Sequence, residues 1–516
     1  MRAAAIFSDR MVLQREKPIT VWGDGAEGRC VTVTLGGVCA SGVVSAGKWR
    51  VTLPPMPAAD NLTMTIACGA IEIVFHEIAV GEVWLCGGQS NMEFEIRNEQ
   101  NGKALLETLT PECGVRYFYT PKQRMIDDGF EQMLRSTAWQ TASPEQAQAW
   151  SAVGLYFAME IAKKLGVTVG LIGCNWGGTS ASCWVSRDIL EERGSLHPYL
   201  SEYAAAVEGK TEAEMIAAYD EYEAYQTKWY EAYSALMQTA PETTWEAAQA
   251  KLGASRYPGP MGIKNECRPC GLYETMLRQV CPYTLRGFLF YQGESDDCKP
   301  QTYETLLEGL IGCWRRDWED PALPFLNVQL PMFRYAHDPD WGHWCLIREA
   351  QMRVYEKLRH TGLAVIPDCG ALDDLHPADK APVGHRLALQ ALYMVYHRIP
   401  EEAACAPMYR SSYVQGHTMV IETVHASEGF RLTGAPSGFM LAGADGKAYP
   451  ASAVFGRNQI LLTAEQVPEP VSARYAWANY APVTVFGMNG LPLAPFRTDA
   501  AGCGWGKSAE STANCT

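Results

Sequence analysis

The chain has 516 residues, of which 47% are hydrophobic, so it can form about two to four globular domains with sizeable cores. Its formal net charge of −15 and its pI near 5.2 argue against a general nucleic-acid binder and against a protein held on anionic membranes, because those surfaces would repel it. We therefore expect neither nucleic acid nor a membrane among its partners.

Short β-patterned runs separated by glycine turns fill the first 80 residues. Residues 19–22 and 31–35 are two such runs, and short strands at this spacing predict a small β-sandwich-like domain over residues 1–80. The first nine residues turn polar too early for a secretory signal, and no run approaches the roughly 18 consecutive apolar residues of a membrane span. We expect a cytoplasmic protein, or a secreted one if a leader precedes this sequence.

The 17 cysteines are an odd number scattered without a compact framework, as is typical of thiols that are kept reduced. Cys267 and Cys270 form the single C-x-x-C pair of the sequence. Because no second cysteine pair and no histidine pair at zinc-finger spacing accompany it, the sequence predicts no metal site.

Strand patterns alternate with helical patterns over residues 81–400, which is typical of a parallel sheet with helices on both faces. The helical patterns are 144–165, 303–318, 345–360 and 381–396. A stretch rich in Ala, Glu and Tyr at about 200–255 predicts an inserted helical hairpin, either a lid over the site or a solvated excursion from the body. β-patterned runs return over residues 401–516, so the predicted fold class is α/β with an additional β-domain at each end.

A serine follows the first apolar strand pattern of the middle region. Ser90 stands in Gly88-Gln89-Ser90-Asn91, directly after the apolar run 83–86. A lone serine after a strand is more often a turn residue or a helix cap than a nucleophile. Its assignment as a nucleophile therefore depends on a base supplied from elsewhere in the chain.

A candidate base follows another apolar run, at 363–366. There the sequence reads Asp373-Asp374-Leu375-His376-Pro377. A serine hydroxyl needs an imidazole to take its proton, and the imidazole needs a carboxylate to fix its tautomer. Asp373 and His376 are three residues apart and can point the same way on a turn. The pattern alone is weak, because either aspartate could instead cap the helix that begins near Pro377.

Two further strand patterns end in loops that can supply hydrogen-bond donors. One ends in Gly177 and Gly178, and the other carries Gln292. Acyl transfer needs donors aimed at the developing oxyanion, and the Ser90 N–H, a glycine N–H and the Gln292 amide are suitable groups. Ligands of open α/β sheets bind beyond the carboxyl ends of the strands, so these loops are expected to converge.

Four motif blocks resemble those of SGNH-type carbohydrate esterases, and most nearly those of the sialate O-acetylesterase family. The blocks are Gly88-Gln89-Ser90-Asn91-Met92, Trp176-Gly177-Gly178-Thr179, Tyr291-Gln292-Gly293-Glu294-Ser295 and Asp373-x-x-His376-Pro377. The resemblance implies an SGNH-hydrolase-like sheet, no cofactor, and removal of acetyl esters from sugar hydroxyls through an acetyl-serine intermediate. An α/β-hydrolase nucleophile elbow is not matched, because position 92 is methionine where that motif has glycine.

The resemblance also implies a role for each matching residue. Ser90 would be the nucleophile, His376 the general base and then the general acid, and Asp373 the orienting carboxylate. Asp374 is close enough to His376 to take the place of Asp373. Glu294 would either support the triad or serve as its acid.

The implied oxyanion donors are the Ser90 N–H, the N–H of Gly177 or Gly178, and Gln292. The residues expected to support the triad without belonging to it are Glu294, Asp374 and Asn91.

The expected partner is an O-acetylated carbohydrate. Sialic acid is favoured by resemblance alone, and an acetylated plant polysaccharide such as xylan is the alternative. A non-catalytic carbohydrate-binding protein is a different class of function, against which the intact set of Ser90, Gln292, Asp373 and His376 argues. A retaining glycosidase built on Glu294 and an aspartate is a third possibility. The sequence predicts no oligomeric state.

Overall fold

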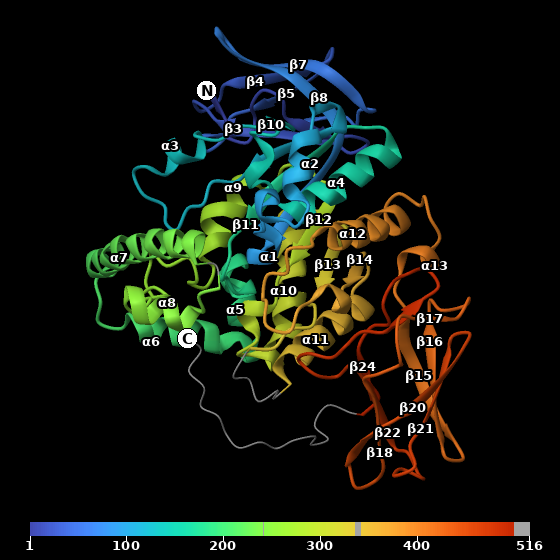
Figure 1. Cartoon of the computed structure of the whole chain (residues 1–516). Helices are drawn as coiled ribbons and strands as arrows, with labels where there is room; N and C mark the ends of the chain where they lie inside the picture. The colour runs from blue at the N-terminus through green and yellow to red at the C-terminus, as the bar shows by residue number, and fades with distance from the viewer. Residues whose placement is uncertain (241, 336–341, 500–516) are drawn as a thin grey trace.

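The computed structural model describes residues 1–240, 242–335 and 342–499. The first part of the chain forms antiparallel strands that lie at one end of the molecule (Figure 1). Along β6 (Lys48–Leu53) exposed and buried residues alternate, as expected for a strand with one face on a core. Two groups of strands are formed: β1 (Arg2–Ala3) and β3 (Ile19–Asp24) with β6, and β4 (Cys30–Leu35), β5 (Val38–Val43) and β7 (Ala59–Cys68).

Strand β8 (Ile71–Gly88) belongs both to these N-terminal strands and to the central sheet. Its first part pairs antiparallel with β7 and parallel with β2 (Val12–Gln14). Its second part pairs parallel with β11 and β12, and every residue from Ile78 to Gly88 is buried. The domain boundary predicted at residue 80 therefore falls inside a single strand.

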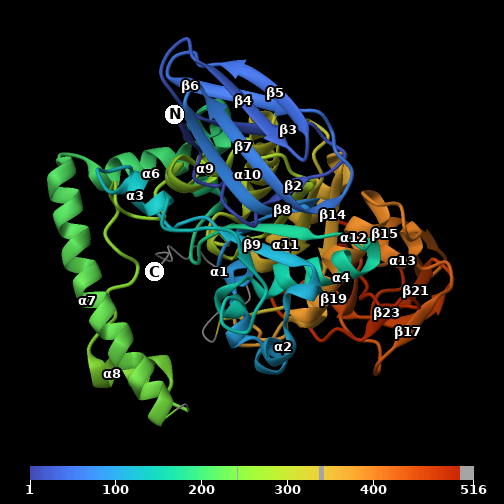
Figure 2. The same ribbon diagram turned by 90° about the horizontal axis from the view of Figure 1, so that it is seen from above.

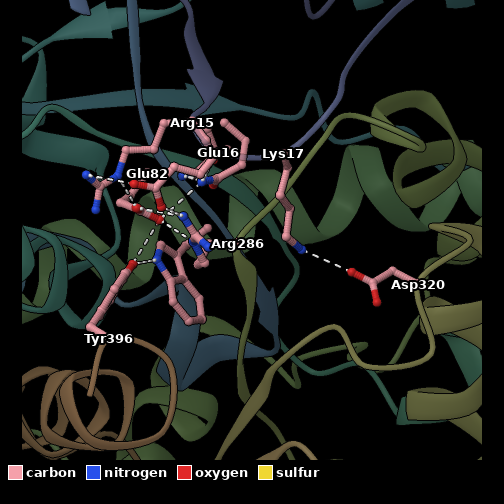
Figure 3. Close-up of polar contacts among 10 residues, drawn as sticks. Arg15, Glu16, Lys17, Glu82, Arg286, Asp320 and Tyr396 are labelled. Atoms are coloured by element: carbon pink, nitrogen blue, oxygen red, sulfur yellow. Dashed lines mark hydrogen bonds and ion pairs between the residues drawn. The ribbon is translucent and has the colours of Figure 1, made fainter. Parts of the chain in front are cut away.

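The carboxylate of Glu82 on β8 is buried and accepts hydrogen bonds from side chains of several other segments (Figure 3). Its oxygens accept hydrogen bonds from Arg15 Nε at 2.6 Å, Arg286 Nε at 2.6 Å, Tyr396 Oη at 3.0 Å and Gln14 Nε2 at 3.2 Å. A charge without solvent exposure is tolerated when it is paired and hydrogen-bonded in this way. Glu82 thus joins the N-terminal segment to the central sheet.

The central sheet has the strand order β10-β9-β11-β8-β12-β13-β14 and is parallel apart from the short edge strand β10. Every residue of its strands from β11 to β14 is buried, as expected for a parallel sheet covered on both faces. The strands are β9 (Val115–Tyr119), β10 (Gln140–Thr141), β11 (Val169–Asn175), β12 (Gly287–Tyr291), β13 (Phe325–Gln329) and β14 (Thr361–Val365).

Helices cover both faces of this sheet. A side chain at Gly154 on α4 (Ala152–Leu165) would meet Cys86 of β8, and one at the adjacent Gly87 of β8 would meet Trp314 on α10 (Tyr303–Asp317). Because successive strand residues point to opposite faces, α4 and α10 lie on opposite sides of the sheet. α12 (Ala381–Met394) packs beside α4, and α11 (His343–Lys357) packs beside α10.

Shorter helices connect these elements. They are α1 (Ser90–Glu93), α2 (Gly102–Thr108), α3 (Phe130–Leu134), α5 (Arg187–Glu192), α9 (Arg278–Val280) and α13 (Glu401–Ala404).

The insertion predicted at about 200–255 is helical and extends away from the body (Figure 2). It contains α6 (His197–Val207), α7 (Glu212–Thr239) and α8 (Trp245–Leu252). A capping box between Thr211 and Glu214 starts α7. Aromatic contacts join α7 to α8, with Trp229 and Trp245 at 5.0 Å between ring centroids. The insertion also contacts the central domain, since Arg124 donates to Glu223 of α7 and Tyr199 of α6 donates to Asp296.

Residues after α13 form a separate β-structure with its own hydrophobic core. Arg497 of this part makes two hydrogen bonds to Glu349 on α11, which fixes it against the central domain. The strands are β15 (Met408–Gln415), β16 (Thr418–Val424), β17 (Phe430–Leu432), β18 (Phe439–Ala442), β19 (Ala448–Pro450), β20 (Ser452–Gly456), β21 (Gln459–Thr463), β22 (Ser472–Tyr475), β23 (Val485–Gly487) and β24 (Phe496–Arg497). The predicted α/β architecture with helices around the sheet and added C-terminal β-structure is confirmed. Among the described residues, no helix combines the length and the apolar character that a membrane crossing requires.

Candidate active site

Ser90 stands at the carboxyl end of β8, where the chain turns from the sheet into α1. Gly88 has φ +133°, and a Cβ at this position would lie 2.1 Å from the carbonyl oxygen of Tyr291. Only glycine fits such a close approach to the neighbouring strand β12. The turn leaves Ser90 partly exposed at the first position of α1, where its N–H has no acceptor within the helix.

His376 reaches Ser90 from a loop 286 positions further along the chain. Its Nε2 lies 2.8 Å from Ser90 Oγ, which is within hydrogen-bonding distance. The loop lies between β14 and α12, so the two residues come from the same end of two parallel strands in the same sheet. This is the arrangement that a serine nucleophile and its general base require.

The two candidate acids occupy different positions relative to His376. Asp374 Oδ1 accepts a hydrogen bond from the backbone N–H of His376 at 2.8 Å. Asp373 is exposed, and in the part of the chain that the structure describes it makes no hydrogen bond or ion pair with His376. Nor does any described carboxylate accept a hydrogen bond from His376 Nδ1. The expected side-chain contact between Asp373 and His376 is therefore not formed in this conformation.

The environment of His376 favours its neutral form. Burial lowers the pKa of the imidazole below its ordinary value, and the positive charge of Lys380 lowers it further, while Asp374 and Glu93 act in the opposite direction. A neutral imidazole can accept a proton, so the group is in the form that a general base needs near neutral pH.

The glycine pair after β11 lies beside Ser90. A Cβ at Gly177 would be 3.2 Å from the Ser90 Cβ, which places this backbone next to the nucleophile. The Gly177 N–H donates to Glu93 Oε2 at 2.7 Å, and Glu93 Oε1 accepts from Lys122 Nζ at 2.5 Å. Gly178 has φ +75°, and no acceptor for its N–H lies among the described residues. Sequence reasoning missed Glu93, although it is the third residue after Ser90.

Gln292 lies in the expected loop but holds that loop in place. Its side chain is fully buried, and its amide nitrogen donates to Asp296 Oδ2 at 2.7 Å, Gln89 Oε1 at 3.1 Å and the Thr179 carbonyl at 3.2 Å. Its amide oxygen accepts from Tyr303 Oη at 2.8 Å. An amide with two donors that already serves three acceptors has none left for an oxyanion. The contacts thus differ from those expected of an oxyanion donor.

Glu294 and Asn91 lie behind the Ser90–His376 pair. Asn91 Nδ2 donates to Glu294 Oε1 at 2.7 Å and to the Leu375 carbonyl at 3.0 Å, and its Oδ1 accepts from Lys380 Nζ at 2.6 Å. Burial raises the pKa of Glu294 to about 7. Glu294 is bonded to Asn91 and not to His376, so its contacts are those of a support and not of the acid of a triad. Sequence reasoning missed Lys380, which follows His376 by four residues.

The thiols of the C-x-x-C pair take part in packing. Cys267 Sγ donates to the Gly178 carbonyl at 3.4 Å, and Cys270 is buried. A different group of possible metal ligands, Glu401, Cys405 and His425, has ligand atoms within 4.8 Å of one another. Glu401 starts α13, Cys405 follows that helix, and His425 follows β16, so this group lies outside the loops around Ser90.

Comparisons with known proteins point to one family. Residues 263–392 match the model of the family described as carbohydrate esterase, sialic acid-specific acetylesterase. The chain is 27% identical to sialate O-acetylesterase of Mus musculus over 429 residues, which cover 77% of this chain and 73% of the mouse protein. For the Homo sapiens sialate O-acetylesterase the identity is 24% over 428 residues, covering 77% and 71%.

A solved structure is similar over almost the whole chain. The crystal structure of a carbohydrate acetylesterase from Xanthomonas citri superposes with a TM-score of 0.76 at 27% sequence identity, covering 96% of this chain and 99% of that one. Family, relatives and structure agree with the resemblance of the four motif blocks. The predicted resemblance is thereby confirmed: residues 263–392 match the sialic acid-specific acetylesterase domain, and the chain is similar to sialate O-acetylesterases over 77% of its length.

Proposed function

We propose that this protein removes acetyl groups from sugar hydroxyls, with Ser90 as the nucleophile and His376 as the general base. The observation that carries the proposal is the 2.8 Å contact between Ser90 Oγ and His376 Nε2 at the carboxyl end of the sheet. Similarity to sialate O-acetylesterases and to a carbohydrate acetylesterase of known structure supports the same chemistry. The placement of the site loops at one edge of a parallel sheet also supports an SGNH-hydrolase-like core.

In the proposed reaction, His376 Nε2 takes the proton of Ser90 as its oxygen attacks the acetyl carbonyl carbon. The tetrahedral intermediate collapses, the bond to the sugar oxygen breaks, and His376 returns the proton to that oxygen. Water then attacks acetyl-Ser90 with His376 as the base, which releases acetate and restores the serine. No cofactor takes part in these steps.

The oxyanion donors that the contacts support are backbone amides. The Ser90 N–H and the Gly178 N–H have no acceptor among the described residues, whereas the Gly177 N–H donates to Glu93. Gln292 instead holds the loop that follows β12 against the loops of Gln89 and Thr179. Preorganised amides of this kind stabilise the charge that develops on the acetyl oxygen.

The acid of the triad is proposed to be one of the two neighbouring aspartates. Asp373 has the spacing of the family motif, whereas Asp374 contacts the backbone of His376 and raises the pKa of its imidazole. Of the two, Asp374 is the one that contacts His376, through the backbone N–H and not through the imidazole. A rotation of the exposed Asp373 side chain toward His376 Nδ1 would restore the family arrangement.

The test is acetate release from O-acetylated sialic acids and from acetylated xylan, measured in parallel with the wild type and with Ser90→Ala. We expect release by the wild type and at least a 1,000-fold loss in the variant, because the oxyanion donors alone leave only a small part of the rate. Acetate release from xylan alone would support the mechanism and would identify an acetylated plant polysaccharide, not sialic acid, as the substrate. Release that survives Ser90→Ala would refute the mechanism.

Labelling of Ser90 by a fluorophosphonate separates this proposal from a carbohydrate-binding protein without catalysis. An activated serine reacts, whereas an ordinary serine does not. His376→Asn should abolish the labelling, and His197→Asn, at an exposed histidine on α6, should leave it unchanged. Binding of acetylated sugars without labelling would favour the non-catalytic function.

A further inference from the structure

Lys380 is a buried lysine in the segment that carries His376. It occupies the N-cap position of α12, and only 1% of its surface is exposed. Its ammonium donates to Asn91 Oδ1 at 2.6 Å and lies 4.7 Å from the centroid of the Phe94 ring. A buried ammonium group is costly unless hydrogen bonds, rings or carboxylates compensate it. The hydrogen bond to Asn91 and the contact with the Phe94 ring therefore stabilise the buried ammonium group.

Asn91 passes the contact on to two other loops. It donates to Glu294 Oε1 after β12 and to the carbonyl of Leu375, the residue directly before His376. Asn91 itself is the residue after Ser90. One hydrogen-bonded group thus ties the nucleophile turn, the Glu294 loop and the His376 loop together, with Lys380 at its end.

Glu294 supplies the opposite charge. The carboxylate raises the pKa of Lys380, although burial is the larger effect and lowers that pKa to about 8. The positive charge of Lys380 in turn counteracts the burial of Glu294. Burial thus opposes the charged form of both groups, and each charge stabilises the other.

Three charged groups act on the protonation of His376, whose imidazole lies within hydrogen-bonding distance of Ser90: Lys380 disfavours protonation, whereas Asp374 and Glu93 favour it. Lys122 partly neutralises Glu93. Lys380 is thus the cation that opposes the two carboxylates around the base.

We propose that Lys380 is a positioning residue of the esterase: through Asn91 it fixes the loop of His376 against Ser90, and it places a positive charge beside that loop. This inference rests on the proposed function, because it assigns Lys380 a role in the action of His376 as a base. A neutral base is needed to activate Ser90, so the charge acts on the reaction without touching the substrate.

The experiment compares Lys380→Gln, Lys380→Met and Lys380→Arg with the wild type in the pH dependence of kcat/KM for acetate release. The glutamine variant keeps a donor and loses the charge, the methionine variant loses both, and the arginine variant keeps the charge. We expect the acid limb to move to higher pH by about half a unit or more in the two neutral variants and to remain in place in the arginine variant. We expect kcat to fall by roughly tenfold in the methionine variant, because the loop loses its anchor.

A matched control is Lys17→Gln, at a partly buried lysine whose ammonium lies 3.0 Å from Asp320 (Figure 3). Neither residue belongs to the loops around Ser90 and His376. It should leave both kcat and the acid limb unchanged. Circular dichroism and thermal unfolding identify a variant that does not fold, and the glutamine and arginine variants then carry the comparison.

The pH dependence of fluorophosphonate labelling of Ser90 provides a second readout that needs no sugar substrate. If the wild type labels but releases no acetate, the proposed substrate fails while the role of Lys380 is still measured by labelling. If rates fall in folded neutral variants but the acid limb stays where it is, Lys380 has only a structural role and the inference is overturned.

Discussion

The buried carboxylate of Glu82 should stabilise the protein without taking part in the reaction. Glu82→Gln keeps the shape of the side chain but removes the charge that faces Arg15 and Arg286 at 2.6 Å. Removing one partner of a buried pair typically costs about 3–5 kcal/mol. The two arginine side chains are 17% and 15% exposed, so water can partly replace the lost contact. We therefore expect the free energy of unfolding to fall by roughly 3 kcal/mol, at the lower end of that range.

Urea unfolding followed by tryptophan fluorescence measures this loss. Trp84 donates to Tyr396 Oη, which also bonds Glu82, so its emission reports on the perturbed region. The midpoint should fall while the slope stays the same. Glu319→Gln is the control, because the pair of Glu319 with Arg50 lies on the surface and should contribute less than about 1 kcal/mol.

Activity at a temperature where the variant is folded should stay within about twofold of the wild type. Gly88 is the sixth residue after Glu82 along the strand, which is about 20 Å at the usual rise per residue. A stability change below 0.5 kcal/mol, or a loss of kcat/KM in the folded variant, would refute this view of Glu82.

The acid limb of kcat/KM should lie below pH 6.5, because the folded protein lowers the pKa of His376 from that value. Activity should be complete at pH values above this pKa and should be lost as the pH falls through it. A midpoint above pH 6.5 would contradict the assignment of His376 as the base. Gly88→Ala should leave less than about a tenth of the activity and lower the thermal midpoint, because φ is +133° and the new Cβ would meet the Tyr291 carbonyl at 2.1 Å; an active and stable variant would show that the turn relaxes. Asp374→Asn should lower kcat/KM more than Asp373→Asn in the same acetate assay, because Asp374 contacts His376, and the reverse order would identify Asp373 as the acid.

The convergence of Ser90 and His376 could be predicted from the sequence. Each follows an apolar strand pattern, and the carboxyl ends of parallel strands share one edge of a sheet. The two residues are therefore brought together by topology, which the order of strands and helices along the chain already indicates.

Contacts inside the loops could not be predicted in the same way. A spacing of three residues allows Asp373 to reach His376 but does not determine its rotamer, and the structure turns it to solvent. The amide of Gln292 is taken by Asp296 and Gln89, because buried polar groups bond to whatever partner lies nearest in space. The burial of Lys380 could not be predicted either, because the partners of its side chain come from two other loops.

The domain boundary near residue 80 could not be located because the apolar pattern does not change there. Residues 78–88 are all buried, although they leave one group of strands and enter another. Strands usually end after about five or six residues, so a strand of 18 residues that serves two sheets is not expected from local sequence.

Strand β8 also limits how this protein can be divided. A fragment that begins at residue 81 would lose the half of the strand that pairs with β7 and β2, and would expose backbone donors and acceptors at its new end. The N-terminal strands are therefore not an independent domain that could be exchanged or removed without damage to the central sheet. Recombination or truncation that preserves Ser90 must keep the chain intact from the beginning of β8, so the nucleophile and the N-terminal strands have to be inherited as one unit.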